Sequence, residues 1–112
     1  MFAAVRHYVL ESTAADSVIE RSSDVEAILG SVPRWIGGQL IRTRDGLIVV
    51  MVGPDEPVVI EAGRRFASWA LEHLPAWTTV PGPDVWAGDL VWSDLTPDDR
   101  RPAAPTAGAE AR

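Results

Sequence analysis

Apolar and polar positions along the chain follow two repeating patterns, which predict strands and helices in the order β-α-β-β-α-β. Short runs rich in β-branched and aromatic residues are typical of strands, and apolar residues three or four positions apart are typical of helices. The expected strands are residues 2–10, 35–43, 47–52 and 85–92. The expected helices begin near Thr13 and Glu56 and end before Pro33 and Pro75.

The first helix is predicted from a start signal that is followed by a helical stripe. Thr13 and Asp16, three residues apart, resemble a capping box. Gly30 and Pro33 are typical of the end of a helix. The apolar residues between these signals are Val18, Ile19, Val25, Ile28 and Leu29. Their spacing predicts one continuous helix.

The second helix has clearer signals at its start and along its faces. Asp55 is a suitable N-cap, and Pro57 is tolerated in the first turn. Glu61 and Arg65 are four residues apart and can pair on the exposed face. The inner stripe consists of Val59, Ala62, Phe66, Trp69 and His73.

The remaining segments connect these elements and bound the domain. "RDG" at 44–46 is typical of a tight hairpin turn, and strand 47–52 is apolar on both faces, as in a central strand. A proline-rich loop is expected at 75–84. The last residues, 96–112, contain no large apolar side chain. We therefore expect one domain, residues 1–95, followed by a disordered tail.

This order of elements predicts a ferredoxin-like βαββαβ sandwich, which is an α+β fold. Two helices then cover one face of a four-stranded antiparallel sheet, and the other face stays open. Both faces of the strands carry apolar residues, and a large exposed apolar patch usually marks an interface or a ligand site. We therefore expect a homodimer whose two sheets face each other and form an α/β barrel.

Charge and composition narrow the classes of function. The chain has 112 residues and a net charge of −6, which disfavours binding to a nucleic-acid backbone. No apolar segment reaches the length of a membrane span, and the N-terminus does not resemble a secretory signal. We expect a cytoplasmic protein with no membrane partner. All ten cationic residues are arginine, which indicates a GC-rich, actinobacterial genome.

The sequence also disfavours metal and cofactor chemistry. Without cysteine, disulfides, thiolate catalysis and zinc–thiolate sites are excluded. The two histidines, His7 and His73, do not have the spacing of a ligand pair. Neither Gly-x-Gly-x-x-Gly nor Gly-x-Ser-x-Gly occurs. We therefore expect no metal and no cofactor.

Four segments carry a resemblance to a known group of proteins: "MFAAVRHY", "VPRWIGGQLIR", "EAGRRFASWALEHLP" and "VWAGDLVW". Through them, residues 2–92 resemble the dimeric α/β-barrel superfamily and, within it, the antibiotic-biosynthesis monooxygenases. Arg34 and Trp35 stand where that family usually has Gly-Phe. The resemblance implies a ferredoxin-like homodimer. It also implies small-molecule chemistry, such as cofactor-free oxygenation of aromatic polyketides, isomerisation or decarboxylation.

One branch of this superfamily degrades haem, and the resemblance to it is partial. That branch has an Asn on its first strand, a Phe-x-x-Trp on its second helix and a haem-ligating His about nine residues after the Trp. Phe66 and Trp69 match the helical pair. His7 stands at the position of the Asn, and Thr78 stands near the position of the ligand. Two of the three positions differ, so haem degradation is not expected.

His7 is the candidate catalytic residue, and strand alternation decides where it points. His7 shares one face of the first strand with Val5, and Arg6 and Tyr8 share the other. Which of these faces lines the barrel is left open by the sequence. A polar side chain in an apolar cavity needs a partner or a function, so both faces are candidates.

The candidate substrate-binding residues are Gln39, Phe66, Trp69 and His73. Gln39, like Arg42 and Asp89, is a polar residue within an otherwise apolar strand and can hydrogen-bond a ligand if it faces the cavity. The five tryptophans are expected mostly in the core or in a dimer interface, but some can line a pocket for a flat aromatic ligand. His73 is interpreted first as a cap of the last helical carbonyls and second as a binding group.

Three functions compete at this point. The first is a cofactor-independent monooxygenase-like enzyme that acts on an aromatic or polyketide-like molecule in a cavity of the homodimer, with His7 as its base. The second is a non-catalytic module for small-ligand binding or assembly, which the absence of a clear acid–base pair in the sequence favours. The third is a haem-handling protein, which predicts a Soret shift on addition of hemin.

Overall fold

The protein was analysed as a computed structural model, which describes residues 1–92. The predicted tail, 96–112, lies outside the described residues. The elements are β1 Phe2–Val9, α1 Ser12–Glu20, α2 Ser22–Gly30, β2 Gly37–Thr43, β3 Gly46–Gly53, α3 Glu56–His73, the 3-10 helix η1 Pro75–Thr79 and β4 Asp84–Asp89.

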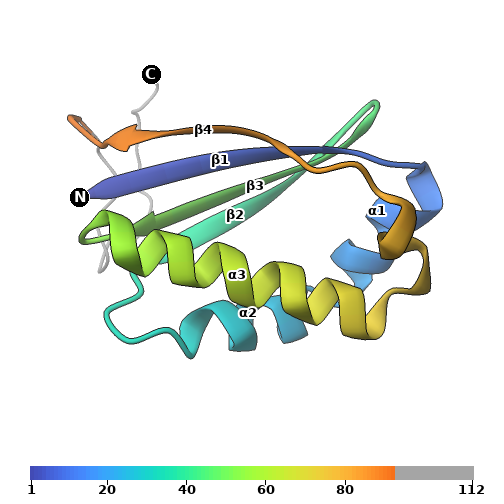
Figure 1. The fold of residues 1–112 in the computed structure, drawn as a ribbon, viewed down its shortest axis with the longest axis horizontal. Helices are drawn as coiled ribbons and strands as arrows, with labels where there is room; N and C mark the ends of the chain where they lie inside the picture. The colour runs from blue at the N-terminus through green and yellow to red at the C-terminus, as the bar shows by residue number, and fades with distance from the viewer. Residues whose placement is uncertain (93–112) are drawn as a thin grey trace, which may run out of the picture.

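The four strands form one antiparallel sheet in the order β2-β3-β1-β4. The two central strands are therefore β1 and β3, as their apolar sequences predict. Figure 1 shows α2 and α3 side by side below the sheet, so that the helices occupy one layer and the strands another. This arrangement confirms the predicted α+β, ferredoxin-like fold.

The first helical segment differs from its prediction, because it is two helices and not one. The chain leaves helical geometry at Arg21, where φ is −104° and ψ is 27°. The capping box predicted at Thr13 is also wrong: α1 begins at Ser12 after Glu11, which makes no side-chain cap. Each helix buries its own short apolar stripe: Ala15 and Val18 in α1, and Val25 and Leu29 in α2.

The start of α3 agrees with its prediction and is linked to the segment before β2. Asp55 Oδ1 accepts a hydrogen bond from the Val58 backbone N–H at 3.3 Å, which is an N-cap. Asp55 Oδ2 is 3.0 Å from Nη1 of Arg34. The φ of Arg34 is 70°, a left-handed conformation that glycine adopts more easily. The carboxylate of Asp55 therefore caps the start of α3 and also pairs with Arg34, whose backbone is strained.

The core lies between the sheet and the helices and is rich in aromatic rings. Tyr8 of β1 and Phe66 of α3 lie 5.8 Å apart between ring centroids. Trp77 closes this group at 5.0 Å from Tyr8. Residues 75–84, predicted as a loop only, thus contain η1 and deliver a buried indole to the core. Burying a large side chain of this kind stabilises the fold by about 1.5–3 kcal/mol.

The other face of the sheet has no helix of the described chain against it (Figure 1). Its residues are identified by the strand register. One row across the four strands is Gln39, Val50, Val5 and Trp86, and the next is Ile41, Ile48, His7 and Asp84. We call this surface the open face. It is mostly apolar, and Trp86 is 60% exposed on it.

β1 ends at Val9, one residue before its predicted end, and two other strands differ more from their predictions. β2 begins at Gly37, because the expected first residues, Trp35 and Ile36, lead into the strand without belonging to it. β4 ends at Asp89, so that Leu90 to Trp92 lie beyond it. Both differences fall at strand ends, where apolar residues continue past the last paired position.

Candidate functional site

His7 lies on the open face, on the central strand β1 and near the end of that strand. In the register of β1 it stands between Ile48 of β3 and Asp84 of β4. Its side chain is 21% exposed. The question left by strand alternation is therefore answered for this chain: His7 points away from the helices, and Arg6 and Tyr8 point toward them.

Asp45, in the turn between β2 and β3, supplies a partner for His7. Nε2 of His7 is 3.0 Å from Oδ1 of Asp45. The same oxygen accepts a hydrogen bond from Oγ1 of Thr43 at 2.9 Å. The turn is held against β1 by the Leu10 backbone N–H, which donates to the Asp45 carbonyl at 3.0 Å. The carboxylate is thus held by two side-chain contacts, and the backbone of the same residue is held by a third contact.

These contacts favour the ionised form of the carboxyl group. The hydrogen bond from His7 is the main reason that the pKa of Asp45 lies below its usual value of 3.8, and the hydrogen bond from Thr43 acts in the same direction. When Nε2 of His7 carries the proton that is shared with Asp45, Nδ1 has a free lone pair. The pair can then accept a proton at Nδ1 while Asp45 stabilises the resulting cation.

The open face surrounds this pair with apolar side chains, the amide of Gln39 and the carboxyl group of Asp84, which stands beside His7 in the register of β4. Gln39 lies on the same face but on β2, two strands from β1. With about 4.8 Å between neighbouring strands, its backbone is roughly 10 Å or more from that of His7. Val50 and Ile48 of β3 fill the space between the two strands. His7 and Gln39 can therefore contact opposite ends of one flat molecule.

The other predicted binding residues lie on the helix side of the sheet. Phe66 is completely buried and Trp69 is 5% exposed, with ring centroids 6.1 Å apart. His73 stacks on Trp69 at 5.8 Å, and its Nδ1 is 3.0 Å from the Trp69 carbonyl oxygen. The structure therefore separates the predicted site residues into two groups on opposite sides of the sheet.

Arg42 and Asp89 do not join His7 either. Arg42 faces the helices and forms an ion pair with Asp16 of α1 at 3.1 Å. Asp89 is paired in register with Phe2 at the end of β4, on the face opposite to Trp86. Of the three mid-strand polar residues considered, only Gln39 shares the open face.

Sequence reasoning missed Asp45 because its contact with His7 is not local. The two residues are 38 positions apart, and only the register of β1 against β3 brings the turn beside His7. The signal was present in the "RDG" turn, but a turn aspartate is usually explained by its own backbone geometry. Register therefore had to be known before the turn could be recognised as part of a site.

Buried polar atoms of Arg6 and Tyr8 form a second polar feature, on the helix side of the sheet. Nε of Arg6 and the hydroxyl of Tyr8 are buried without a hydrogen-bond partner among the described residues. The Arg6 guanidinium lies against Gly63 of α3, where a Cβ would collide with it. Buried polar atoms without partners cost free energy, so this arrangement is a secondary candidate for binding a polar group.

No group of three metal-ligating side chains occurs in residues 1–92. Over the same range, no helix has the length and apolar character needed to cross a membrane.

Solved structures of proteins with known activities share this fold. MhuD of Mycobacterium tuberculosis, a heme degrader solved with two hemes in its active site, has a TM-score of 0.61 and 16% identity, covering 83% of this chain and 98% of MhuD. SnoaB of Streptomyces nogalater, a cofactor-independent oxygenase, has a TM-score of 0.56 and 18% identity, covering 82% and 94%.

A third structure belongs to the same group. It is the monooxygenase ActVA-Orf6 of Streptomyces coelicolor, solved with nanaomycin D, with a TM-score of 0.54 and 16% identity, covering 84% of this chain and 89% of that chain. No protein-family model matches the sequence, and no curated protein matches it. The chain therefore shares the ferredoxin-like fold of these three structures, and its function has to be argued from its own residues.

Proposed function

We propose that this protein is a cofactor-independent monooxygenase-like enzyme that acts on an aromatic or polyketide-like small molecule. The observation that carries the proposal is the contact between His7 Nε2 and Asp45 Oδ1 at 3.0 Å on an apolar surface. A histidine oriented by a carboxylate is the arrangement that a general base needs. The activities of SnoaB and ActVA-Orf6, which share the fold, support the same class of reaction.

The proposed reaction needs only the substrate, dioxygen and a base. Nδ1 of His7 takes a proton from an electron-rich substrate of the anthrone type, and Asp45 stabilises the imidazolium. The substrate anion then donates electrons to dioxygen. One oxygen atom remains on carbon as a new carbonyl group, and the other leaves as water. Exclusion of bulk water from the site, which protects the anion, needs the open face to be covered.

The enclosed site in this proposal forms between two copies of the chain. The open face is apolar and central to the sheet, and its exposed members include Trp86 and Ile41. A second copy packed against this surface by a twofold axis would bury these side chains and close a cavity over His7. Gln39 would then hydrogen-bond a carbonyl or hydroxyl group of the ligand.

The experiment is oxidation of dithranol, an anthrone-type probe, by the purified protein under oxygen. We expect an anthraquinone product and one dioxygen consumed per product. His7→Ala should lower kcat by about 100-fold or more, the usual contribution of a general base. Asp45→Asn should lower kcat less, because the imidazolium loses its charged partner while the base itself remains.

His73→Ala is the matched control, since it removes the other histidine from the opposite side of the sheet. We expect it to leave kcat nearly unchanged. Unchanged turnover in His7→Ala would overturn the assignment of the base. Saturable binding of the probe without product would support the alternative function, a non-catalytic ligand-binding module.

Haem degradation, the activity of MhuD, has less support in this chain. The space beside Phe66 and Trp69 is filled by the chain's own rings, with Trp77 at 5.8 Å from Phe66 and 5.0 Å from Tyr8. Thr78, which stands near the position of the haem-ligating histidine in that branch, has no ring nitrogen. The described residues therefore do not fit a haem at this place.

A further inference from the structure

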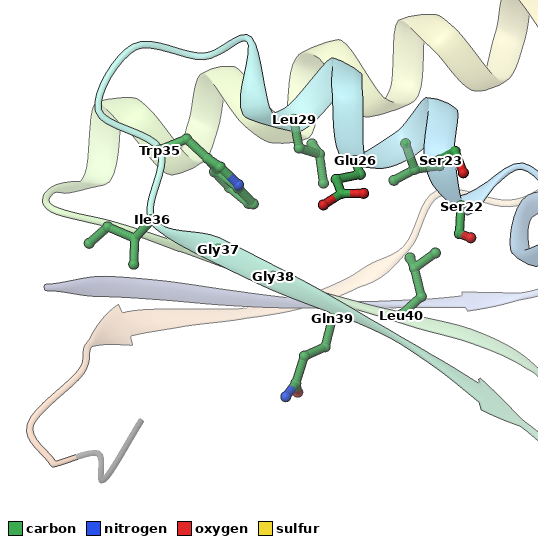
Figure 2. A pocket seen from close by; sticks show the side chains of 11 residues that line it. Ser22, Ser23, Glu26, Leu29, Trp35, Ile36, Gly37, Gly38, Gln39 and Leu40 are labelled. Carbon is green, nitrogen blue, oxygen red and sulfur yellow. The ribbon is translucent and has the colours of Figure 1, made fainter. Parts of the chain in front are cut away.

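A cavity of about 590 Å³ lies between α2 and the first half of β2, on the helix side of the sheet. Its size falls in the range of pockets for small organic molecules. Figure 2 shows α2 above the cavity and β2 below it, with Trp35 at one end. The polar groups that line it on α2 are Ser22, Ser23 and Glu26.

The cavity exists because two consecutive glycines form its floor. A Cβ on Gly38 would collide with the Val50 carbonyl oxygen of the neighbouring strand and would lie 3.1 Å from Cζ2 of Trp35. The bare backbone therefore allows the indole to lie over the strand. Gly37 alternates with Gly38 and faces the opposite side of the sheet, like Gln39, so it contributes only backbone to the lining of the cavity. The indole and the glycine backbone make an apolar corner.

Glu26 contributes a negative charge to this corner. Figure 2 shows its carboxylate between α2 and β2, on the side of the cavity shared with Leu29 and Trp35. Within residues 1–92, Glu26 forms no ion pair, unlike Glu61 and Asp55. The Glu26 side chain is exposed, it lines the same cavity as Trp35, and its carboxylate has no cation of its own among the described side chains.

We propose that this cavity binds a small organic ammonium ion. A cation beside an indole is stabilised by the negative face of the ring, and the unpaired carboxylate of Glu26 adds a full opposite charge. The apolar corner formed by Trp35 and Gly38 accepts the methyl or methylene groups of the ligand, and the Ser22 and Ser23 hydroxyls can bond to a polar end. A neutral ligand of the same shape lacks the attraction of a cation to the indole ring and the attraction to the Glu26 charge.

This site is separate from the proposed catalytic site. Figure 2 shows the side chain of Gln39 below β2, on the opposite side from the cavity, and His7 shares that opposite face with Gln39. Loss of ammonium binding would therefore leave the proposal for His7 untouched. Loss of oxygenase activity would equally leave this proposal untouched.

The test is calorimetric titration of the full chain with benzyltrimethylammonium and with choline. The neutral choline isostere 3,3-dimethylbutan-1-ol is titrated in parallel. We expect at least one ammonium probe to bind, and to bind about tenfold or more tightly than a neutral isostere, the factor that 1.4 kcal/mol represents. Failure of both ammonium probes to bind, or equal binding of the neutral probe, would overturn the proposal.

Glu26→Gln keeps the shape of the side chain and removes its charge, so it should weaken ammonium binding about tenfold and leave binding of the neutral probe unchanged. The control is Glu20→Gln, the same change at the end of α1 and outside the cavity lining, which should preserve affinity. If both variants weaken binding equally, the effect comes from net charge and the cavity is not the site.

Trp35 provides an independent signal for the location of the probe. The indole N–H resonance of Trp35, assigned by its loss in Trp35→Phe, should shift during the ammonium titration. The indole resonance of Trp86, on the other face of the sheet, should stay in place. A shift of Trp86 without a shift of Trp35 would place the ligand on the open face and contradict the proposal.

Discussion

The two faces of the sheet are formed by the same alternating strands but differ in how deeply their side chains are buried. On the helix side, Leu47 and Met51 of β3 are completely buried, together with Phe66 of α3. On the open face, the intervening residues of β3 are only partly buried, and Trp86 of β4 is 60% exposed. Both faces are apolar, so hydrophobicity alone does not reveal which face the chain's own helices cover.

The polar residues on the two faces differ in a second way. On the helix side, the buried atoms of Arg6 and Tyr8 lack partners within the described chain. On the open face, His7 has a carboxylate partner that is itself held by Thr43. An oriented base on an uncovered surface suits chemistry at an interface. The buried atoms of Arg6 and Tyr8 have no such oriented partner among the described residues. The following experiments test this difference.

The largest effect on the free energy of unfolding should come from truncating an aromatic residue of the core. The same truncation on the open face is the comparison. Phe66→Ala should lower the free energy of unfolding by about 3–5 kcal/mol, because it leaves a cavity in a fully buried core. Trp86→Ala should cost the monomer much less, since most of its surface is exposed before any association. Chemical denaturation at low protein concentration measures both. Equal losses would mean that the open face is part of a core within one chain.

A charge placed on the open face should break association without unfolding the chain. Val50 lies at the centre of that face, between Gln39 and Val5. Val50→Arg should weaken the proposed dimer by at least about 100-fold, since like charges would meet across the twofold axis. Sedimentation equilibrium measures the dissociation constant. Ile60→Arg, at an exposed position of α3, is the control and should leave the constant unchanged.

The smallest effect is the contribution of Asp45 to the pH dependence of the unfolding free energy. Its folded pKa lies below 3.8, mainly through the hydrogen bond from His7. Because the unfolded state binds the proton more readily, this group stabilises the fold above that value, and the stabilisation is lost as pH falls through the folded pKa. Asp45→Asn should therefore show a flatter decline in unfolding free energy between about pH 5 and pH 2.

Carboxyl titration by NMR provides the companion measurement. In His7→Ala, the pKa of Asp45 should rise toward its usual value, because its main hydrogen-bond donor is removed. Thr43→Val should produce a smaller rise in the same direction. If the pKa of Asp45 is unchanged in both variants, the contact between Asp45 and these two residues does not persist in solution.

Much of the fold was predictable because its signals are local. The N-cap at Asp55, the proline in the first turn of α3 and the pair between Glu61 and Arg65 were each inferred from neighbouring residues, and each is present. The break at Arg21 was missed because it contains neither glycine nor proline. The two helices on either side of the break pack differently, α1 against β3 and α2 against α3, and such packing is not local.

The candidate site was only half predictable for the same reason. His7 was identified from its polarity within an apolar strand, and strand alternation left two possible faces for it. The role of Asp45 depends on the register between β1 and the β2–β3 turn, which no short motif specifies. Trp77 was likewise assigned to a loop, although η1 turns its ring into the core.

The carboxylate of Asp55 has a consequence for local motion. Its two oxygens serve different segments: one caps α3 and the other holds Arg34 before β2. If the first turn of α3 opens, Arg34 loses its partner, and its left-handed backbone can relax to a lower-energy conformation. The approach to β2 and the beginning of α3 should therefore open together, as one cooperative unit of the native state.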